Sequence, residues 1–487
     1  KSYTRKIYEV LLTFKLEHLL TKEQILEIYM NQIFLGQRAY GFASASQIYF
    51  GKPLQDVTIA EAAMLAGLPQ APSAYNPVRN PRRARARQMY IIERMVENGF
   101  ITAEQAETAR NEELKLRPAG RDDGFHAEFV AEMARQAIVT QYGEAAYTRG
   151  LVVTTSIDTR AQEAAYRSVR QGVLEYERRQ FYRGPELFIT LPDDPQERDA
   201  AIDEALTERP DNGDLLSAVV LEASARKVVA VRQDGEPFEV VGEGLKPVQS
   251  GLSDKAGPNI KIRPGAVIRV VKVGDKAWRI TQLPEVEAAF VALDPRNGRI
   301  SALIGGFDFQ KSKFNHVTQA WRQPGSSFKP FIYSAALEKG VTPMTIVNDA
   351  PLFYSAEETG GKPWEPKNYD GQFEGPMSVR RALAKSKNMV SIRVLQLVGT
   401  QSAQSWVTRF GFDADKHPPY LTMALGAGAV TPLQMASGYA VFANGGYRIA
   451  PSFITRVTDQ RGKVLFEAPQ TTLDSAPRAI DPRNAFV

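Results

Sequence analysis

The sequence of 487 residues contains no cysteine. This absence excludes cysteine catalysis, thiolate metal sites and disulfide bonds, but it does not fix the redox compartment. Histidine is scarce as well, and the four that exist are scattered: His18, His126, His316 and His417. A Ser-His-Asp triad and a multi-histidine metal site are therefore disfavoured, which draws attention to serine–lysine pairs. No run of residues is long and apolar enough to cross a bilayer.

The composition is that of a globular protein with more than one domain. Apolar residues make up 43% of the chain and charged residues 24%. The 60 basic and 55 acidic residues leave a net charge of +5. This small excess is compatible with an anionic surface or substrate, but it is too diffuse to indicate a nucleic-acid partner.

The segment 321–330 combines a sharp turn with the start of a core helix. Pro324 and Gly325 favour the turn, and apolar residues at helical spacing follow until Gly340. Ser326 then lies in the first helical turn, and Lys329 lies one turn further along the same face. The helix dipole and partial burial would lower the lysine pKa and let neutral Lys329 act as base for Ser326. Ser-x-x-Lys alone is a common pattern in helices and favours a serine N-cap followed by a surface lysine.

A polar tripeptide, Ser386-Lys387-Asn388, interrupts a second helical pattern about sixty residues later. Taken alone, it fits an ordinary turn between two helices. Ser-x-x-Lys followed at this distance by Ser-x-Asn, however, is the signature order of penicillin-recognising serine enzymes. The third element of that signature, Lys-Thr-Gly or Lys-Ser-Gly, does not occur in the sequence. We therefore expect the natural polypeptide to carry this strand after residue 487.

Residues 1–115 are predicted to be helical. Three Thr-x-x-Glu/Gln capping boxes, at 21–24, 58–61 and 102–105, each precede an apolar-periodic run. Within the first helix, Arg5, Lys6 and Glu9 share one face. The helical spacing by itself favours a solvated ion-pair cluster, and a site for a phosphate or a divalent cation is the alternative.

Several stretches of this helical part resemble the later motifs of the peptidoglycan glycosyltransferase domain, in the family's order. They are Arg-Lys-x-x-Glu at 5–9, Ile-Leu-x-x-Tyr-x-Asn-x-Ile-x-x-Gly at 25–36 and Ala-Gly-Leu-Pro-x-x-Pro at 66–72. The resemblance implies that Arg5, Lys6 and Glu9 help to hold the lipid-linked pyrophosphate donor, with Glu9 as a ligand of a divalent cation, magnesium or manganese. The family's catalytic glutamate motif has no match, and we expect it, with a membrane anchor, before residue 1.

The sequence pattern changes twice in the middle of the chain. A break at 118–120 opens an interdomain linker over 116–184 that includes a strand at 151–155 and a helix at about 159–178. Between 185 and 283, acidic and irregular sequence at 193–214 gives way to several short strands with hairpin signals. This pattern favours a small barrel or an oligosaccharide-binding-type fold. The hairpin at 289–305 then opens the last domain, 284–487.

The whole chain resembles the class A, bifunctional penicillin-binding proteins, and most closely their 1A branch. The 182–185 segment Tyr-Arg-Gly-Pro and the β-rich insert carry the resemblance to that branch. It implies a multidomain α+β fold. The parts are a helical, lysozyme-like glycosyltransferase part (1–115), a small β-barrel, OB-like insert and an α/β penicillin-recognising serine transpeptidase domain.

The resemblance implies polymerisation of lipid II and cross-linking of stem peptides through an acyl-enzyme on Ser326. Lys329 would take the serine proton, Ser386 would relay a proton to the leaving D-Ala, and Asn388 would bind substrate and Lys329. No cofactor is implied for this second reaction.

The implied partners are nascent peptidoglycan, β-lactam antibiotics, the bacterial inner membrane and an outer-membrane lipoprotein activator that contacts the insert. Both catalytic domains would be periplasmic, behind a single-pass anchor. A β-lactamase-like serine hydrolase and a non-catalytic cell-wall scaffold or β-lactam sensor remain as alternatives.

Overall fold

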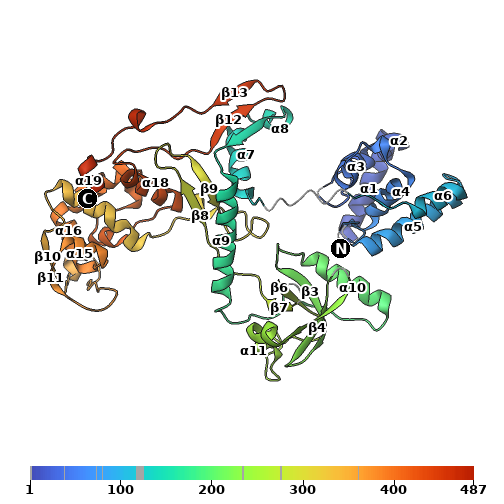
Figure 1. The fold of residues 1–487 in the computed structure, drawn as a ribbon, viewed down its shortest axis with the longest axis horizontal. Helices are drawn as coiled ribbons and strands as arrows, with labels where there is room; N and C mark the ends of the chain where they lie inside the picture. Colours follow the sequence, from blue (N-terminus) through green and yellow to red (C-terminus); the bar gives the residue numbers. More distant parts are fainter. Residues whose placement is uncertain are drawn as a thin grey trace. The chain divides into compact units, whose positions relative to one another are not determined.

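The computed structural model describes residues 3–37, 39–72, 74–78, 80–116, 125–232, 235–274, 277–359 and 361–487, with the side chains of 3–9 and a few other helical residues excepted. The chain divides into two compact units, and Figure 1 labels the helices and strands of both. One comprises Lys1–Gly124 with Glu177–Leu283, and the other comprises Phe125–Tyr176 with Pro284–Val487.

The first 115 residues are helical, as predicted. The helices are α1 (Tyr3–Leu19), α2 (Lys22–Gln32), α3 (Phe42–Phe50), α4 (Ile59–Gly67), α5 (Pro81–Glu97) and α6 (Ala103–Asn111). All three capping boxes are present, at the starts of α2, α4 and α6. The backbones of Arg5, Lys6 and Glu9 belong to α1, but their side chains lie outside the described residues, so their predicted role stays a prediction.

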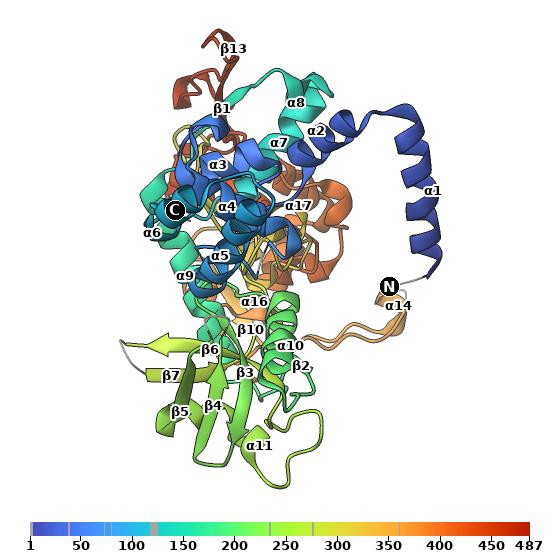
Figure 2. The same cartoon turned by 90° about the vertical axis from the view of Figure 1, so that its right-hand side faces the viewer.

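The β-rich insert forms a six-stranded antiparallel sheet (Figure 2). Its order is β2-β6-β3-β4-β5, and β7 pairs with residues 269–273 of β6, beyond the residues that pair with β2. The strands are β2 (Leu187–Phe188), β3 (Leu216–Ala223), β4 (Lys227–Val231), β5 (Pro237–Val241), β6 (Ala266–Val273) and β7 (Ala277–Thr281). A short helix, α11 (Gln249–Leu252), follows β5. β4 pairs antiparallel with β5 and β6 with β7, in agreement with the hairpin signals of this segment.

The expectation of irregular sequence at 193–214 is wrong. Residues Pro195–Glu208 form α10, whose first turn is capped by Asp194 through the backbone N–H of Glu197. Ile202, Ala205 and Leu206 of this helix are buried against the sheet. Only this narrow apolar stripe faces the sheet, so the many charges of the segment concealed its helical period.

The two ends of the insert are held together by a polar clamp. The backbone N–H of Arg183 donates to Gln282 Oε1 at 2.9 Å, and the Arg183 guanidinium donates to the carbonyl of Leu283 at 2.6 Å. The Gln282 amide donates in turn to Glu177 at 2.9 Å. The incoming and outgoing chain therefore lie side by side.

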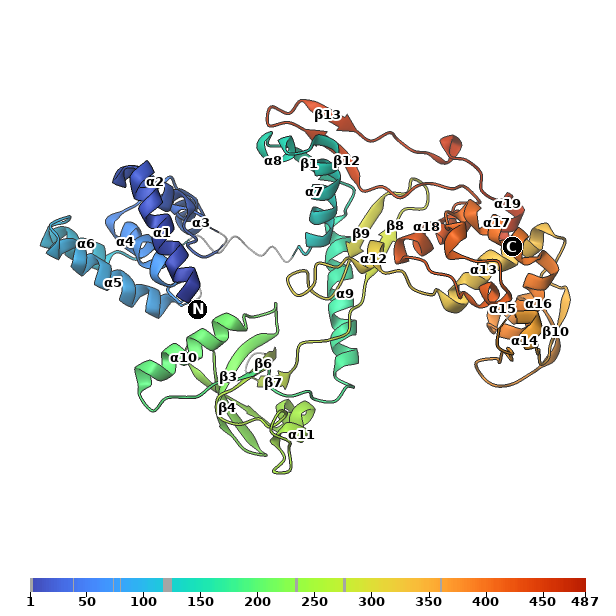
Figure 3. The same cartoon turned by 180° about the vertical axis from the view of Figure 1, so that it is seen from behind.

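Among its described residues the second unit contains a helical body, which includes one small sheet, and two further small sheets outside it. β1 (Val152–Thr155) pairs with β12 (Ile454–Thr458), which pairs with β13 (Val464–Glu467) (Figure 3). β8 (Phe290–Leu293) and β9 (Ile300–Ile304) form the predicted hairpin. α7 (Glu128–Tyr142) packs Phe129 and Val130 against this hairpin, and α8 (Ala145–Thr148) and α9 (Thr159–Glu177) follow.

The helical body surrounds α13 (Lys329–Glu338), whose apolar side chains form the centre of the largest core cluster. Around it lie α12 (His316–Gln319), α14 (Ala356–Thr359), α15 (Val379–Ala384), α16 (Asn388–Val398), α17 (Thr400–Val407), α18 (Pro432–Ala443) and α19 (Pro482–Phe486). A two-stranded sheet of β10 (Ile346–Asp349) and β11 (Gly375–Ser378) completes it.

The predicted linker 116–184 contains regular structure, and part of it belongs to the second unit. α7, α8, β1 and nearly all of α9 lie there, and β1 joins the sheet of β12 and β13. The boundaries predicted from the sequence, 1–115, 116–184, 185–283 and 284–487, stay predictions.

Candidate active site

Ser326 lies in a 3₁₀ turn, η4 (Gly325–Phe328), that leads directly into α13. Pro324 precedes the turn and Pro330 occupies its continuation, where a missing N–H costs nothing. The backbone N–H of Lys329 donates to the carbonyl of Ser326, which closes the turn. Phe328 is fully buried in the core, while Ser326 is exposed. The turn is thus anchored by its aromatic residue and presents its serine to solvent.

Lys329 is a buried amine with three acceptors. The residue as a whole is 1% exposed. Nζ donates to the carbonyl of Ser386 at 2.7 Å, to the Ser386 hydroxyl at 3.0 Å and to Asn388 Oδ1 at 2.8 Å. Burial lowers the pKa of this lysine from 10.5 to about 8. The structure thus brings together Lys329, Ser386 and Asn388, and it rules out a solvated surface lysine.

Ser386 adopts a left-handed backbone, with a φ of 55°. This conformation costs a residue with a β-carbon about 1–2 kcal/mol. It occurs where the chain turns from α15 into α16, and the backbone N–H groups of Ser386 and Lys387 donate back to Leu383 and Ala382 at 3.0 and 2.9 Å. The turn points the Ser386 carbonyl and hydroxyl at the same amine. Strain of this kind is common at functional sites.

Lys387 points away from Lys329 and into a group of carboxylates. Its Nζ lies 2.9 Å from Asp370, 3.2 Å from Glu374 and 3.4 Å from Asp349. Burial by itself would lower the Lys387 pKa, but the hydrogen bonds to Asp370 and Glu374 outweigh it and raise the pKa. The middle residue of the tripeptide is therefore a buried cation at neutral pH.

Asn368 connects these carboxylates to the start of α16. Its side-chain amide donates to Asp349 at 2.7 Å, and its Oδ1 accepts from the backbone N–H of Asn388 at 2.8 Å. The Asn388 amide donates to the carbonyl of Lys367 at 2.8 Å. Sequence reasoning missed Asn368 and Asp349, because a lone asparagine in a loop and an aspartate ending a strand carry no local signal of burial.

Two further contacts hold the surrounding elements in place. Tyr333, one turn beyond Lys329 on α13, hydrogen-bonds Ser391 of α16 at 3.1 Å, and Ser391 donates to the carbonyl of Lys387 at 2.8 Å. On the other side, η7 (Leu421–Leu425) ends at Gly426, whose φ is 70°. A β-carbon at Gly426 would lie 2.1 Å from the carbonyl oxygen of Gly325, so the chain approaches the serine turn more closely than a side chain permits.

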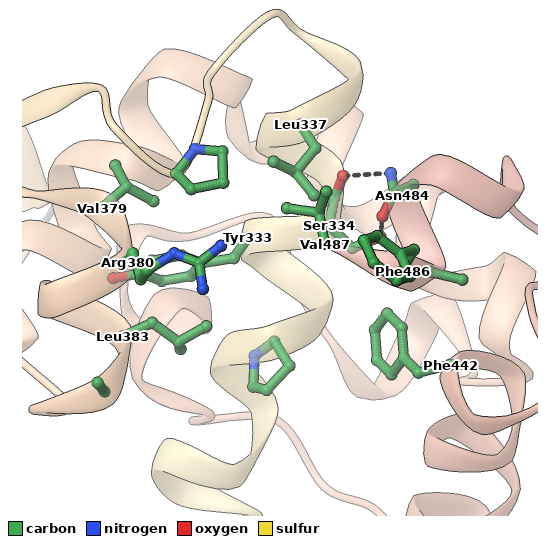
Figure 4. Close-up of a pocket in the computed structure, with 14 residues that line it drawn as sticks. Tyr333, Ser334, Leu337, Val379, Arg380, Leu383, Phe442, Asn484, Phe486 and Val487 are labelled. Atoms are coloured by element: carbon green, nitrogen blue, oxygen red, sulfur yellow. Dashed lines mark hydrogen bonds between the residues drawn. The ribbon is translucent and has the colours of Figure 1, made fainter.

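A separate cavity of about 420 Å³ lies along α13 (Figure 4). Tyr333, Leu337 and Phe442 are among its lining residues, whereas Ser326, Lys329 and Asn388 are not. At one side of it, Asn484 of α19 exchanges hydrogen bonds with Ser334 at 2.8 and 2.9 Å. The cavity therefore contributes nothing to the surroundings of the Lys329 amine.

Among the residues that the structure describes, no group of three or more His, Asp or Glu side chains is arranged to hold a metal ion. Glu9, the predicted cation ligand, falls outside that set. The described helices also include none with the length and apolarity needed to span a membrane.

Comparisons with protein families match three successive parts of the chain. Residues 1–96 match the family described as Transglycosylase, residues 182–286 match the Penicillin-binding protein OB-like domain, and residues 288–482 match the Penicillin binding protein transpeptidase domain. These matches confirm the predicted order of a helical part, an OB-like insert and a carboxy-terminal serine-enzyme domain.

Individual relatives match nearly the entire chain. Penicillin-binding protein 1A of Neisseria flavescens is 45% identical over 488 residues, which cover 100% of this chain and 61% of the relative. That of Pseudomonas aeruginosa is 43% identical, over 96% of this chain and 57% of the relative. The crystal structure of penicillin-binding protein 1A from Haemophilus influenzae aligns with a TM-score of 0.74 at 35% identity, over 96% of this chain and 72% of that one. The chain thus spans about three fifths of the length of these curated relatives.

Proposed function

Since the chain belongs to the class A penicillin-binding proteins of the 1A type, we propose that it acts as a bifunctional peptidoglycan synthase, which polymerises lipid II and cross-links stem peptides by D-Ala-D-Ala transpeptidation. One observation carries the cross-linking half of the proposal. The buried Lys329 amine lies one helical turn from the exposed Ser326. It donates hydrogen bonds to Ser386 and to Asn388, the serine and the asparagine of the Ser-x-Asn motif.

The first step is acylation of Ser326. A Lys329 pKa of about 8 leaves about a tenth of the amines neutral at pH 7. A neutral amine keeps two hydrogens for its acceptors and has a lone pair for the Ser326 proton. The Ser326 oxygen then bonds to the carbonyl carbon of the penultimate D-Ala, and the backbone N–H of Ser326 supplies one oxyanion donor.

The second step expels the terminal D-Ala. The peptide C–N bond breaks, and its nitrogen takes a proton that Lys329 holds and that the Ser386 hydroxyl relays across their 3.0 Å contact. The amine of a second stem peptide then attacks the ester carbonyl and loses a proton to the same relay. The bond from the carbonyl carbon to the Ser326 oxygen breaks, and that oxygen takes a proton back from Lys329. Asn388 orients both Lys329 and the substrate amide.

A penicillin tests this half directly, because its strained lactam offers Ser326 an equivalent amide. Treatment of the full-length protein should give an adduct on the peptide that contains Ser326, detected by mass spectrometry. Ser326→Ala should abolish the adduct, and the matched control Ser327→Ala, at the adjacent exposed serine, should keep it. An adduct elsewhere would contradict the mechanism. A rapidly lost adduct would favour the β-lactamase-like hydrolase, and no adduct would favour the scaffold or sensor.

The polymerising half rests on the transglycosylase match over residues 1–96. Arg5 and Lys6 would bind the pyrophosphate of the lipid-linked donor, and Glu9 would contribute to holding a divalent cation, magnesium or manganese, that neutralises the same charge. Glycan synthesis with and without a chelator tests the cation.

Lipid II, nascent peptidoglycan and β-lactams are the partners of this function. Because lipid II resides in a membrane, the protein would act at the inner membrane, with its catalytic domains in the periplasm. The OB-like insert would receive an outer-membrane lipoprotein activator. Cross-linking in whole cells, with and without residues 185–281, tests the activator contact.

A further inference from the structure

Two lysines separated by one residue have opposite environments at the start of α16. The Lys385 side chain is 44% exposed and pairs with Glu374, whereas the Lys387 side chain is 2% exposed. Lys387 donates to Asp370 at 2.9 Å and to the carbonyl of Gln372 at 3.2 Å, beside its contacts with Glu374 and Asp349. A lysine is found so deeply buried only when its charge is matched by partners.

The partners of Lys387 come from separate segments of the helical body. Asp349 ends β10, while Asp370, Gln372 and Glu374 lie in the loop that leads to β11. Asp349 accepts in addition from the backbone N–H of Glu374 at 3.0 Å and from Asn368 at 2.7 Å. The Lys387 ammonium thus joins a strand and a loop to the turn between α15 and α16.

This cation lies between the two residues that contact Lys329. Ser386 has a left-handed backbone conformation. Asn388 is the first residue of α16, and its backbone N–H donates to the side-chain oxygen of Asn368. Side chains of residues adjacent in the chain point in different directions here. Ser386 and Asn388 face the Lys329 amine, and Lys387 faces the carboxylates.

We infer that Lys387 is a positioning residue, which fixes the Ser386 and Asn388 acceptors around the Lys329 amine by anchoring the turn between them to Asp349, Asp370 and Glu374. The inference rests on the proposed acylation of Ser326. Lys387 itself touches neither Ser326 nor the Lys329 amine by any hydrogen bond within the described residues. Its effect is therefore on the rate of the chemical step and not on the binding of a ligand.

The test is the acylation kinetics of the full-length protein with a fluorescent penicillin. The dependence of the labelling rate on penicillin concentration separates the dissociation constant of the first complex from the acylation rate constant. Lys387→Met should reduce the acylation rate constant by about 10- to 100-fold, the usual effect of a misplaced catalytic group. The dissociation constant should stay unchanged, and labelling should still reach the endpoint of the unmodified protein.

Two further variants keep the test decisive. Lys385→Met removes the exposed lysine that shares Glu374 and should be acylated at the unmodified rate. Asp370→Asn removes the closest partner of Lys387 at a carboxylate that is 53% exposed, so folding should tolerate it. Asp370→Asn should slow acylation about 3- to 10-fold. If the Lys387→Met protein does not fold, Asp370→Asn takes its place in the test.

A purely structural role makes a different prediction. If Lys387 only stabilises the fold, the Lys387→Met protein should have a lower melting temperature and a smaller labelled fraction. The molecules that do fold should be acylated with the unmodified rate constant. That result, or equal slowing by Lys385→Met, would overturn the inference. Failure of the unmodified protein to be labelled on Ser326 would overturn the proposed function, and the inference with it.

Discussion

The Nζ of Lys329 lies 2.8 Å from the Oδ1 of Asn388, although the two residues are 59 positions apart in the chain. The Asn388 amide nitrogen is occupied by the carbonyl of Lys367, so the side-chain oxygen is the group that faces the amine. α13 and α16 are thereby joined by a contact between the proposed proton carrier and the residue proposed to orient it.

Lys329→Ala should slow acylation of Ser326 by about two to four orders of magnitude, the usual contribution of a positioned general base. Lys339→Ala, at an exposed position just beyond the end of α13, is the matched control and should keep the unmodified rate. The measurement is labelling by penicillin over time. Equal rates for both variants would contradict the role of Lys329 as base.

The acylation rate should depend on pH through the Lys329 amine. Burial lowers the Lys329 pKa to about 8, and only the neutral form accepts a proton, so the rate should fall about tenfold for each pH unit below 8 and level off above it. Asn388→Asp places a carboxylate beside the amine, which favours the ammonium form and should move the profile to higher pH. A flat profile between about pH 6 and 9 would exclude this titration.

Substitutions at Ser386 should separate backbone strain from chemistry. Glycine accepts a φ of 55° without strain, whereas alanine does not. Ser386→Gly should therefore be more stable than Ser386→Ala by about 1 kcal/mol in the free energy of unfolding. Both variants lose the hydroxyl that contacts Lys329 and should be acylated slowly. Denaturant titration and penicillin labelling check the two parts, and equal stability of the two variants would argue against strain.

Glu9→Gln should abolish glycan synthesis from lipid II and leave penicillin labelling of Ser326 intact, because it removes the charge proposed to hold a cation in the amino-terminal part. Glu17→Gln, at an exposed position later in α1, should polymerise normally. Unchanged glycan synthesis by Glu9→Gln would return Arg5, Lys6 and Glu9 to the interpretation as a surface ion-pair cluster.

Local signals in the sequence predicted much of the fold. Thr58 and Glu61 form the reciprocal hydrogen bonds of the capping box that their spacing indicates. The apolar period after Gly325 corresponds to the buried face of α13. In both places the residues that determine the structure are neighbours along the chain, so a short window of sequence contains all the information.

The surroundings of Lys387 could not be predicted in this way. Lys385 and Lys387 are the same residue type in the same short turn, and only the tertiary approach of Asp349 and Asp370 makes one of them a buried cation. The left-handed backbone of Ser386 could not be predicted either, because the residue at this position is a serine and not a glycine or an asparagine, which favour that conformation. Long-range partners, which a single sequence does not identify, decide both features.

The contacts of Arg183 with Gln282 and Leu283 hold the two ends of the insert close together. Because the chain leaves and rejoins within hydrogen-bonding distance, a linker of a few residues would close the gap if the segment between were absent. Lengthening, replacing or removing that segment would therefore not change the distance that the remaining polypeptide must bridge.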